Sequence, residues 1–317
     1  MSPSAACTCF TISTLLRVLL GALLWFMTHH AAQASDESDS YYQIIANTLS
    51  GIASEVTTAA AYPELTAELY RFKNQLQQEL DQFVPPILNR TPQHIALILD
   101  GNRRWADAKG YSDRSTGHLF CALRVAQTLA IAKQLGFEQV TLYMFSTENF
   151  KRSEHEVGVS MALLKHSLHQ AKEELLKSDA QVRHLGRREG LPADALAAID
   201  QLVEVSSENT GLKVNMAINY GGTVEVEDAI RRIISAGIQS DDQPVLPKFL
   251  YSGQLDGWTN PDLIIRTGKE KRSSNFLPMQ SVYSEWSFRD ELWPDFTPEK
   301  FSEALQDFSQ RKRRYGQ

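Results

Sequence analysis

The sequence has little of several features, and each shortage narrows the class of protein. Only three cysteines occur among 317 residues, and Cys7 and Cys9 lie in the first ten positions, so no disulfide framework holds the main part of the chain. Neither charge sign dominates, because 38 acidic and 32 basic side chains give a net charge of −6, which argues against a general nucleic-acid coat. With 43% hydrophobic and 22% charged residues, the chain is neither disordered nor a multi-span membrane protein.

Long hydrophobic runs are also missing, with one exception near the start. Residues 18–27 are all apolar, Arg17 is the only full charge before them, and no acidic residue precedes Asp36. The Ala-Gln-Ala sequence at 32–34 fits a signal cleavage site, whereas the apolar run is short for a membrane-spanning helix. Residues 1–34 are therefore interpreted as an apolar leader, and an export signal, a membrane anchor and an organelle transit peptide all remain open.

Residues 35–90 are interpreted as a polar connector that becomes helical. Its apolar positions recur in steps of three and four, and Pro85 and Pro86 end the pattern. This spacing predicts an amphipathic helix that packs on the domain or on a partner. The apolar positions are Leu65, Leu69, Phe72, Leu76, Leu80 and Phe83.

From His94 onward, short apolar strands alternate with helical patterns. This alternation predicts an α/β fold, with a mostly parallel central sheet surrounded by helices in a single domain at residues 91–317. Strands are expected at 95–99, 140–145, 182–185, 212–218 and 263–265. Helices are expected at 119–135, 157–176, 192–205, 224–238 and 298–314.

Ligands of open parallel sheets bind beyond the carboxyl ends of the strands, so the residues that follow each strand are the candidates for chemistry. Asp100 follows the first strand, where a carboxylate is well placed for Mg²⁺. Gly101 lets the backbone approach a ligand closely, and the amides of the next helix can bind phosphate. Arg103, Arg104 and Arg114 add charge-assisted donors. The alternative is a polar turn with solvated arginines.

Two later loops carry similar residues. Residues 146–152 carry hydroxyl, amide and basic side chains that suit a diphosphate or a reacting centre. The alternative is that Ser146 and Asn149 only cap a helix, which needs the same residue types. Residues 266–276 hold four cations within seven positions and favour an oxyanion cradle over a solvated loop. His118 opens a helix behind Gly117, which suits a role toward a proton or a diphosphate. Together these loops predict an enzyme that handles two phosphorylated groups with Mg²⁺. No GxxxxGK[ST] or GxGxxG motif occurs, which weighs against standard NTPases and dinucleotide enzymes.

Several longer motifs stand in a fixed order over residues 94–316. They are HIALILDGNRRWA, GH, LYMFSTENFKR, NMAINYGG, DLIIRTG, RSSNFLP, YSEW, LWPDF and RRYG. In this order they resemble the cis-prenyltransferases, the undecaprenyl diphosphate synthase family. The resemblance implies a parallel sheet with an elongated hydrophobic tunnel, usually in a homodimer. It also implies Mg²⁺-dependent condensation of isopentenyl diphosphate with an allylic diphosphate, such as farnesyl or geranyl diphosphate, and no nucleic-acid partner.

The resemblance also assigns roles to single residues. Asp100 and Glu285 would hold the metal, and in a homodimer the Glu285 of the neighbouring subunit is a candidate for this role. The catalytic residues would be Asp100, His118, Ser146 and Asn149. The substrate-binding residues would be Gly101, Asn102, Arg103, Arg104, Trp105, Arg114, Phe150, Arg152, Arg266, Arg272, Ser274 and Arg314.

The chain departs from the family pattern in places. Thr223 and Lys269 stand where arginine and glycine are common, and one extra residue precedes Arg114. Met144 stands where long-chain members often have a small residue, so we hypothesise that the product is a short or medium chain. The alternative is that this methionine simply packs in the core. Two other functions remain as alternatives: a non-catalytic accessory subunit of a heteromeric prenyltransferase, and a binding protein for prenyl diphosphates. We expect a cytoplasmic or membrane-associated protein, with the leader leaving organelle targeting or export open.

Overall fold

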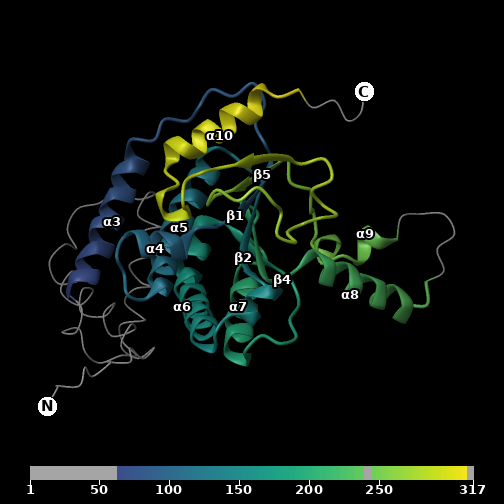
Figure 1. The fold of residues 1–317 in the computed structure, drawn as a ribbon. Coiled ribbons are helices and arrows are strands. Elements are labelled where there is room, and N and C mark those ends of the chain that lie inside the picture. Colours follow the sequence, from purple (N-terminus) through teal and green to yellow (C-terminus); the bar gives the residue numbers. More distant parts are fainter. Residues whose placement is uncertain (1–62, 239–244, 313–317) are drawn as a thin grey trace, which may run out of the picture.

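The computed structural model describes residues 63–238 and 245–312 (Figure 1). The predicted leader, the first part of the connector (residues 35–62) and the predicted substrate ligand Arg314 lie outside these residues. In the described ranges, no helix combines the length and apolarity that a membrane crossing needs.

A single six-stranded sheet forms the centre of the domain, and all of its strand pairs are parallel. The order across the sheet is β3-β4-β2-β1-β5-β6. The chain begins in the middle at β1, builds one side, and then returns to build the other, so the topological switch point lies at β1. The predicted α/β class is confirmed. The strands are β1 (His94–Ile98), β2 (Gln139–Ser146), β3 (Gln181–Leu185), β4 (Lys213–Tyr220), β5 (Leu263–Arg266) and β6 (Glu285–Phe288).

Helices and short turns surround this sheet (Figure 1). The α-helices of the described residues are α3 (Pro63–Asp81), α4 (Asn102–Ala108), α5 (Gly117–Gln134), α6 (Glu154–Ser178), α7 (Ala193–Val205), α8 (Gly222–Ser235), α9 (Leu246–Phe249) and α10 (Pro298–Gln310). The 3-10 turns are η2 (Arg114–Thr116), η3 (Thr147–Lys151), η4 (Ser252–Gln254) and η5 (Trp293–Asp295).

The two faces of the sheet are covered differently. Successive side chains of a strand point to opposite faces. Ile95 and Leu97 of β1 therefore join the core beneath α5, α6, α7 and α10. Ala96 and Ile98 join a smaller core that includes Tyr251 and Phe276, which come from the loops beside β5. The helix-covered face is the one with space for a large cavity, as described below.

Helix α3 adds an outer layer to the domain. Its apolar side chains Leu69, Phe72 and Leu76 are at most 8% exposed and pack with Trp105 of α4 and Phe120 of α5. The ring of Phe72 lies 5.1 Å from that of Phe120 and 6.2 Å from that of Trp105. The amphipathic helix expected in the connector is present, and it packs on the domain.

Two elements, β6 and α9, were not expected from the pattern, and α4 was expected only as a helix start after Gly101. β6 is an edge strand of four residues, and only Ser287 in it is buried, so it shows no apolar run. α4 carries the polar sequence Asn-Arg-Arg, which reads as a turn, and α9 has only four residues. Helices α8 and α10 also end earlier than expected, at Ser235 and Gln310. Short elements fall below the length at which hydrophobic periodicity is informative.

Candidate active site

A cavity of about 690 Å³ lies against the helix-covered face of the sheet, between the sheet, α5 and α6. Its volume falls in the range of small-molecule sites. One end opens beyond the carboxyl end of β1, at Asp100. The other end reaches Val214 of β4, which lies level with Ile95 through the parallel pairing. Five strand residues separate these levels, so the cavity extends roughly 16 Å along the sheet.

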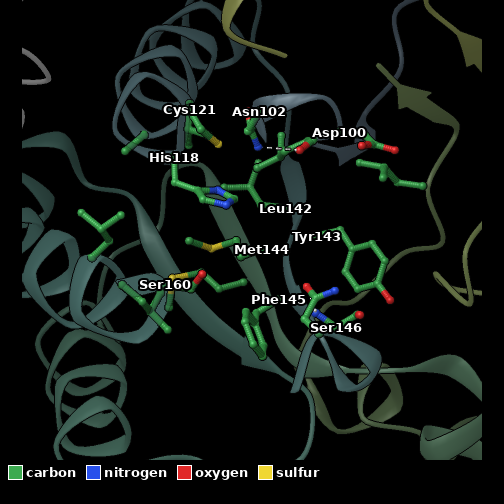
Figure 2. A pocket seen from close by; sticks show the side chains of 18 of the residues that line it. Asp100, Asn102, His118, Cys121, Leu142, Tyr143, Met144, Phe145, Ser146 and Ser160 are labelled. Carbon is green, nitrogen blue, oxygen red and sulfur yellow. Dashed lines mark hydrogen bonds between the residues drawn. The ribbon is translucent and has the colours of Figure 1, made fainter. Parts of the chain in front are cut away.

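The walls of the cavity divide into a charged end and an apolar body. Six arginines and two carboxylates line it, which leaves an excess of four positive charges, and all eight lie at or beyond the carboxyl ends of the strands. The body is lined by α5, α6 and the inner sides of β2 and β4. Figure 2 shows His118, Met144 and Ser160 along this cavity. Its apolar residues include Val125, Leu129, Leu142, Met161, Leu164, Leu168, Val182, Leu202 and Met216.

Asp100 is held at the charged end by both its backbone and its side chain. Its carboxylate accepts hydrogen bonds from Arg104 at 3.2 Å and from Arg266 at 2.7 Å. Its amide donates to Oγ1 of Thr267, and its carbonyl accepts from the same hydroxyl and from the Trp293 amide. The carboxylate therefore has a defined position between two cations.

The turn after Asp100 needs glycine. Gly101 adopts φ of +106°, and a Cβ there would lie 2.8 Å from the side chain of Leu292. The turn leads directly into α4, where Asn102 donates to the Leu99 carbonyl and Arg103 pairs with Glu156 of α6 at 3.1 Å. Among the described residues, the Oδ1 atom of Asn102 and the Nε atom of Arg103 are buried with no hydrogen-bond partner.

The loop after β5 supplies a second group of donors. Arg266 is only 4% exposed, and its guanidinium bonds Asp100, the Ser274 hydroxyl at 2.7 Å and the Arg272 carbonyl. Its Nε atom has no partner. Ser274 and Asn275 both adopt left-handed backbone angles, which cost about 1–3 kcal/mol each in a non-glycine residue.

Asn275 holds this strained loop to its neighbours. Its amide nitrogen donates to Glu148 at 2.8 Å and to the Thr223 hydroxyl at 3.1 Å, and its oxygen accepts from the Thr223 amide. Tyr143 adds a bond from its hydroxyl to the Ser274 carbonyl and stacks on Phe276 at 4.4 Å. Thr223, although it differs from the arginine common in the family, therefore helps to hold the loop that carries Ser274.

The loop after β2 contains both a cap and cavity-lining side chains. Ser146 and Asn149 form the reciprocal cap of η3, with the Ser146 amide bonded to Asn149 Oδ1 at 3.1 Å. The capping alternative is therefore present in the structure. Both residues also line the cavity, together with Arg152.

His118 and Cys121 lie on successive turns of α5 at the cavity wall (Figure 2). Burial, with the nearby charges of Arg152 and Arg103, lowers the pKa of His118 to about 4, so its imidazole is neutral at pH 7. Burial raises the pKa of Cys121 to about 12, so its thiol is protonated and unreactive as a nucleophile.

Arg114 and Arg272 also have carboxylate partners, as Arg103, Arg104 and Arg266 do. Arg114 makes two hydrogen bonds to Asp107, at 2.6 and 2.8 Å, and Arg272 pairs with Glu270 at 2.6 Å. Both arginines are exposed and line the mouth of the cavity. These surface pairs are weak, so a multiply charged anion can displace their carboxylates.

Other predicted residues do not join this group. Trp105 points toward α3 and donates its ring N–H to Asp295, and Phe150 packs on Phe145 outside the lining. Glu285 begins β6 level with Ile95, roughly 16 Å along the sheet from Asp100, and it pairs with Arg90 and Arg311. Within one chain, Glu285 and Asp100 therefore do not share a metal.

Several residues that hold the site together were not assigned a role from the sequence, although Thr267 and Asn275 lie in the predicted cradle at 266–276. Thr267 holds Asp100 in place, Tyr143 holds the Ser274 carbonyl, and Asn275 ties three loops together. Tyr143 reads as an ordinary strand residue. The apolar lining of α6 reads as core, because a helix face toward a cavity has the same periodicity as one toward packed side chains.

Fold and site together define an α/β enzyme whose cavity fits an apolar molecule with an anionic head group. The family model described as "Putative undecaprenyl diphosphate synthase" matches residues 98–316. The isoprenyl transferase of Bacillus subtilis is 40% identical over 231 residues, which cover 71% of this chain and 87% of that protein. The isoprenyl transferase of Treponema denticola is also 40% identical, over 71% of this chain and 97% of that protein.

Solved structures agree with these relatives. Lavandulyl diphosphate synthase from Lavandula x intermedia, in complex with dimethylallyl diphosphate, aligns with a TM-score of 0.68 and 30% identity, covering 72% of this chain and 99% of that chain. A probable undecaprenyl diphosphate synthase from Campylobacter jejuni aligns with a TM-score of 0.60 and 27% identity, covering 72% of this chain and 100% of that chain. The chain belongs to the undecaprenyl diphosphate synthase family of cis-prenyltransferases and is an enzyme of the prenyl transferase type.

Proposed function

We propose that the protein condenses isopentenyl diphosphate with an allylic diphosphate in a Mg²⁺-dependent reaction. The observation that carries this proposal is the position of Asp100 between Arg104 and Arg266, at the charged end of a long apolar cavity. Such a cavity can hold a prenyl chain in its body and a diphosphate at its mouth. The solved relative with dimethylallyl diphosphate supports an allylic diphosphate as one substrate.

The two groups of donors match two diphosphates. Residues of the first turn would hold the allylic diphosphate, and those of the loop after β5 would hold isopentenyl diphosphate. Buried N–H donors without a partner occur in both groups, the Nε atom of Arg103 in the first and the Nε atom of Arg266 in the second. Such atoms are costly without a ligand, which supports binding of anions here. The first group is Gly101, Asn102, Arg103, Arg104 and Arg114, and the second is Arg266, Arg272 and Ser274.

Asp100 is the residue that would hold Mg²⁺. No group of three or more His, Cys, Asp or Glu side chains that could hold a metal occurs in the described ranges. This fits Mg²⁺, which binds through one or two carboxylates and completes its shell with waters and substrate phosphates. When bound, Mg²⁺ would neutralise charge on the leaving diphosphate. Arg104 and Arg266 would then turn from Asp100 toward phosphate oxygens.

The remaining chemistry is assigned to the residues behind the mouth. Loss of the allylic diphosphate leaves cationic character on the allylic carbon, which the apolar wall keeps away from water. The alkene of isopentenyl diphosphate attacks this carbon, and the product then loses a proton. His118, with its neutral imidazole, lines the cavity together with Ser146 and Asn149, and a diphosphate oxygen or one of these polar side chains would accept this proton.

Met144 is proposed to limit the product to a short or medium chain. It is half-buried on β2 and its side chain lies along the cavity, between His118 and Ser160 (Figure 2). A growing prenyl chain that enters the cavity from the mouth would meet this side chain. The competing explanation, that Met144 only fills the core, is weakened by its contact with open space.

A homodimer is proposed as the active form. Helix α8 projects from the domain (Figure 1) and exposes Ile230 and Ile234, with Ile234 72% exposed, and Ile238 just beyond the helix is exposed as well. Val282 and Tyr283, which follow the loop after β5, are more than 60% exposed. Such side chains are suited to an interface between subunits. A neighbouring subunit could also bring its Glu285 or Arg314 to this chain's site. Location in the cytoplasm or at a membrane surface stays a proposal, since the leader lies outside the described residues.

Turnover by the purified single chain tests the proposal. The chain with both diphosphates and Mg²⁺ should form longer prenyl diphosphates, and it should lose turnover in EDTA. Asp100→Ala should lower kcat by roughly 10²–10³-fold, because a preorganised electrostatic contribution is lost. An inactive chain that gains activity only with a second protein would instead indicate an accessory subunit. Substrate binding without any turnover would indicate a binding protein.

A further inference from the structure

Arg124 is a buried charge whose acidic partner comes from helix α3. It lies on α5, is 1% exposed, and bonds Glu79 of α3. Gln127 completes the contact, because it accepts from Arg124 at 2.6 Å and donates to Glu79 at 3.1 Å and to the Leu76 carbonyl at 2.7 Å. We call Glu79, Arg124 and Gln127 the α3 clamp. Burial raises the pKa of Glu79, but bonds from Arg124 outweigh this, so its pKa lies below the usual value and the pair is ionised at pH 7.

The other side of Arg124 leads to the candidate active site. Its Nε atom donates to the Pro294 carbonyl at 3.0 Å, within η5. The preceding residue, Trp293, donates its amide to the Asp100 carbonyl at 3.0 Å. The following residue, Asp295, accepts the ring N–H of Trp105 at 2.8 Å. A continuous chain of hydrogen bonds and one short turn therefore joins α3 to the backbone of Asp100.

The clamp matters because a buried guanidinium must keep a carboxylate partner. Removal of Glu79 leaves Arg124 as an uncompensated buried charge, which is strongly unfavourable. The side chain can relieve this only by moving toward the water that replaces Glu79, and this motion takes its Nε atom away from Pro294. The turn that fixes the Asp100 carbonyl then loses one of its contacts, while the Trp293 ring still donates to the Cys121 carbonyl and Asp295 still accepts from Trp105. Reacting groups must be held within roughly 0.5 Å for efficient turnover, so a small shift is enough.

We propose that Glu79 and Arg124 are positioning residues. Through them, helix α3 holds η5 in place, and η5 in turn holds Asp100 in its catalytic position. Neither residue lines the cavity, so neither touches substrate. The inference goes beyond the proposed function. Only the expected loss of kcat rests on that function, because it requires Asp100 to take part in turnover. It also gives the connector helix a role in the reaction in addition to covering the domain.

The kinetic experiment compares four variants of the full chain. Glu79→Ala should lower kcat by about 10- to 100-fold, as is typical when the support of a metal-site ligand is removed, with KM changed little. Glu79→Gln, which keeps a hydrogen bond without the charge, should lose less. The double variant Glu79→Met with Arg124→Met should regain thermal stability, because an apolar pair can replace a buried ion pair, yet it should stay slow because Pro294 has no donor. Ile199→Ala on α7 is the control for general destabilisation.

A second measurement does not depend on turnover. Amide hydrogen exchange of residues 292–296 should be faster in Glu79→Ala and in the double variant than in wild type or Ile199→Ala. Unchanged exchange in the two clamp variants overturns the proposal whether or not the wild type is active. So does recovery of kcat together with stability in the double variant, or an equal loss of kcat in Ile199→Ala. A wild type without turnover refutes the proposed function, while the exchange data still decide the clamp.

Discussion

Asp100 should weaken the binding of free diphosphate in the absence of metal. Its carboxylate occupies Arg104 and Arg266, and it reduces the positive charge at the cavity mouth. In EDTA, inorganic pyrophosphate must displace this carboxylate from both arginines. Asp100→Ala removes the competitor and raises the excess of positive charge around the cavity from four to five. The same substitution that we expect to lower kcat should therefore tighten metal-free binding of pyrophosphate.

The stability cost follows from the two arginines. Arg104 is 41% exposed in its side chain, so its pair with Asp100 contributes only about 0–1 kcal/mol. Arg266 is 4% exposed, and the loss of its carboxylate leaves a buried charge with a cost of about 2 kcal/mol. For a domain of this size, about 2 kcal/mol lowers Tm by roughly 4–8 °C. Saturating pyrophosphate should recover most of this loss, because it binds the folded state.

Isothermal titration calorimetry in EDTA measures the affinity. We expect roughly tenfold tighter pyrophosphate binding for Asp100→Ala, which corresponds to about 1.4 kcal/mol. Asp107→Asn is the matched control, since its partner Arg114 also lines the mouth but the pair is about half exposed. This control should change the affinity less than threefold and Tm by about 1 °C or less. Weaker pyrophosphate binding by Asp100→Ala in EDTA would refute the reasoning, because it would show that the carboxylate supports the anion rather than competing with it.

Three further predictions concern product length, the loop after β5 and acid stability. Met144→Ala should lengthen the products seen by chromatography, and an unchanged distribution, or a wild type that already makes C55, would sink the chain-length proposal. Asn275→Gly keeps the left-handed backbone but removes the bonds to Glu148 and Thr223, so it should raise KM for isopentenyl diphosphate roughly three- to tenfold and leave kcat nearly unchanged. An unchanged KM would contradict a role of Asn275 in holding the loop. Burial lowers the pKa of His94 from 6.5 to about 4, so the unfolded chain takes up the proton first and stability should fall between pH 6.5 and 4. Urea midpoints measure this, with a shallower slope for His94→Gln, and a flat profile for the wild type would exclude it.

The pattern of apolar strands and helices was enough to predict the fold class. The five predicted strands are present, because each contains apolar residues that are buried in a parallel sheet, although Arg183 and His184 interrupt them in β3. β6 escaped prediction because an edge strand that contains Glu285 and Ser287 has no such run. The strand order could not be read from the chain either, since nothing local states that β4 lies between β2 and β3.

The candidate site was predicted in part. Asp100, the arginines of the first turn and Arg266 follow strands whose carboxyl ends meet at one edge, and the structure brings them together. Trp105 and Phe150 lie next to site residues in sequence, but the direction of each side chain is set by packing against α3 and Phe145. The cavity itself was not predictable, because its apolar lining has the same composition and spacing as a packed core.

By itself, the sequence determined which chemistry the loops can carry and that a parallel sheet would place them at one edge. These properties depend on residue type and local periodicity. Only the tertiary structure decided that Asp100 lies between Arg104 and Arg266, that Glu285 lies at the opposite end of the sheet, and that α3 reaches Asp100 through Arg124. The physical reason is that these contacts join residues far apart in the chain, and their geometry depends on how whole layers pack rather than on any local pattern.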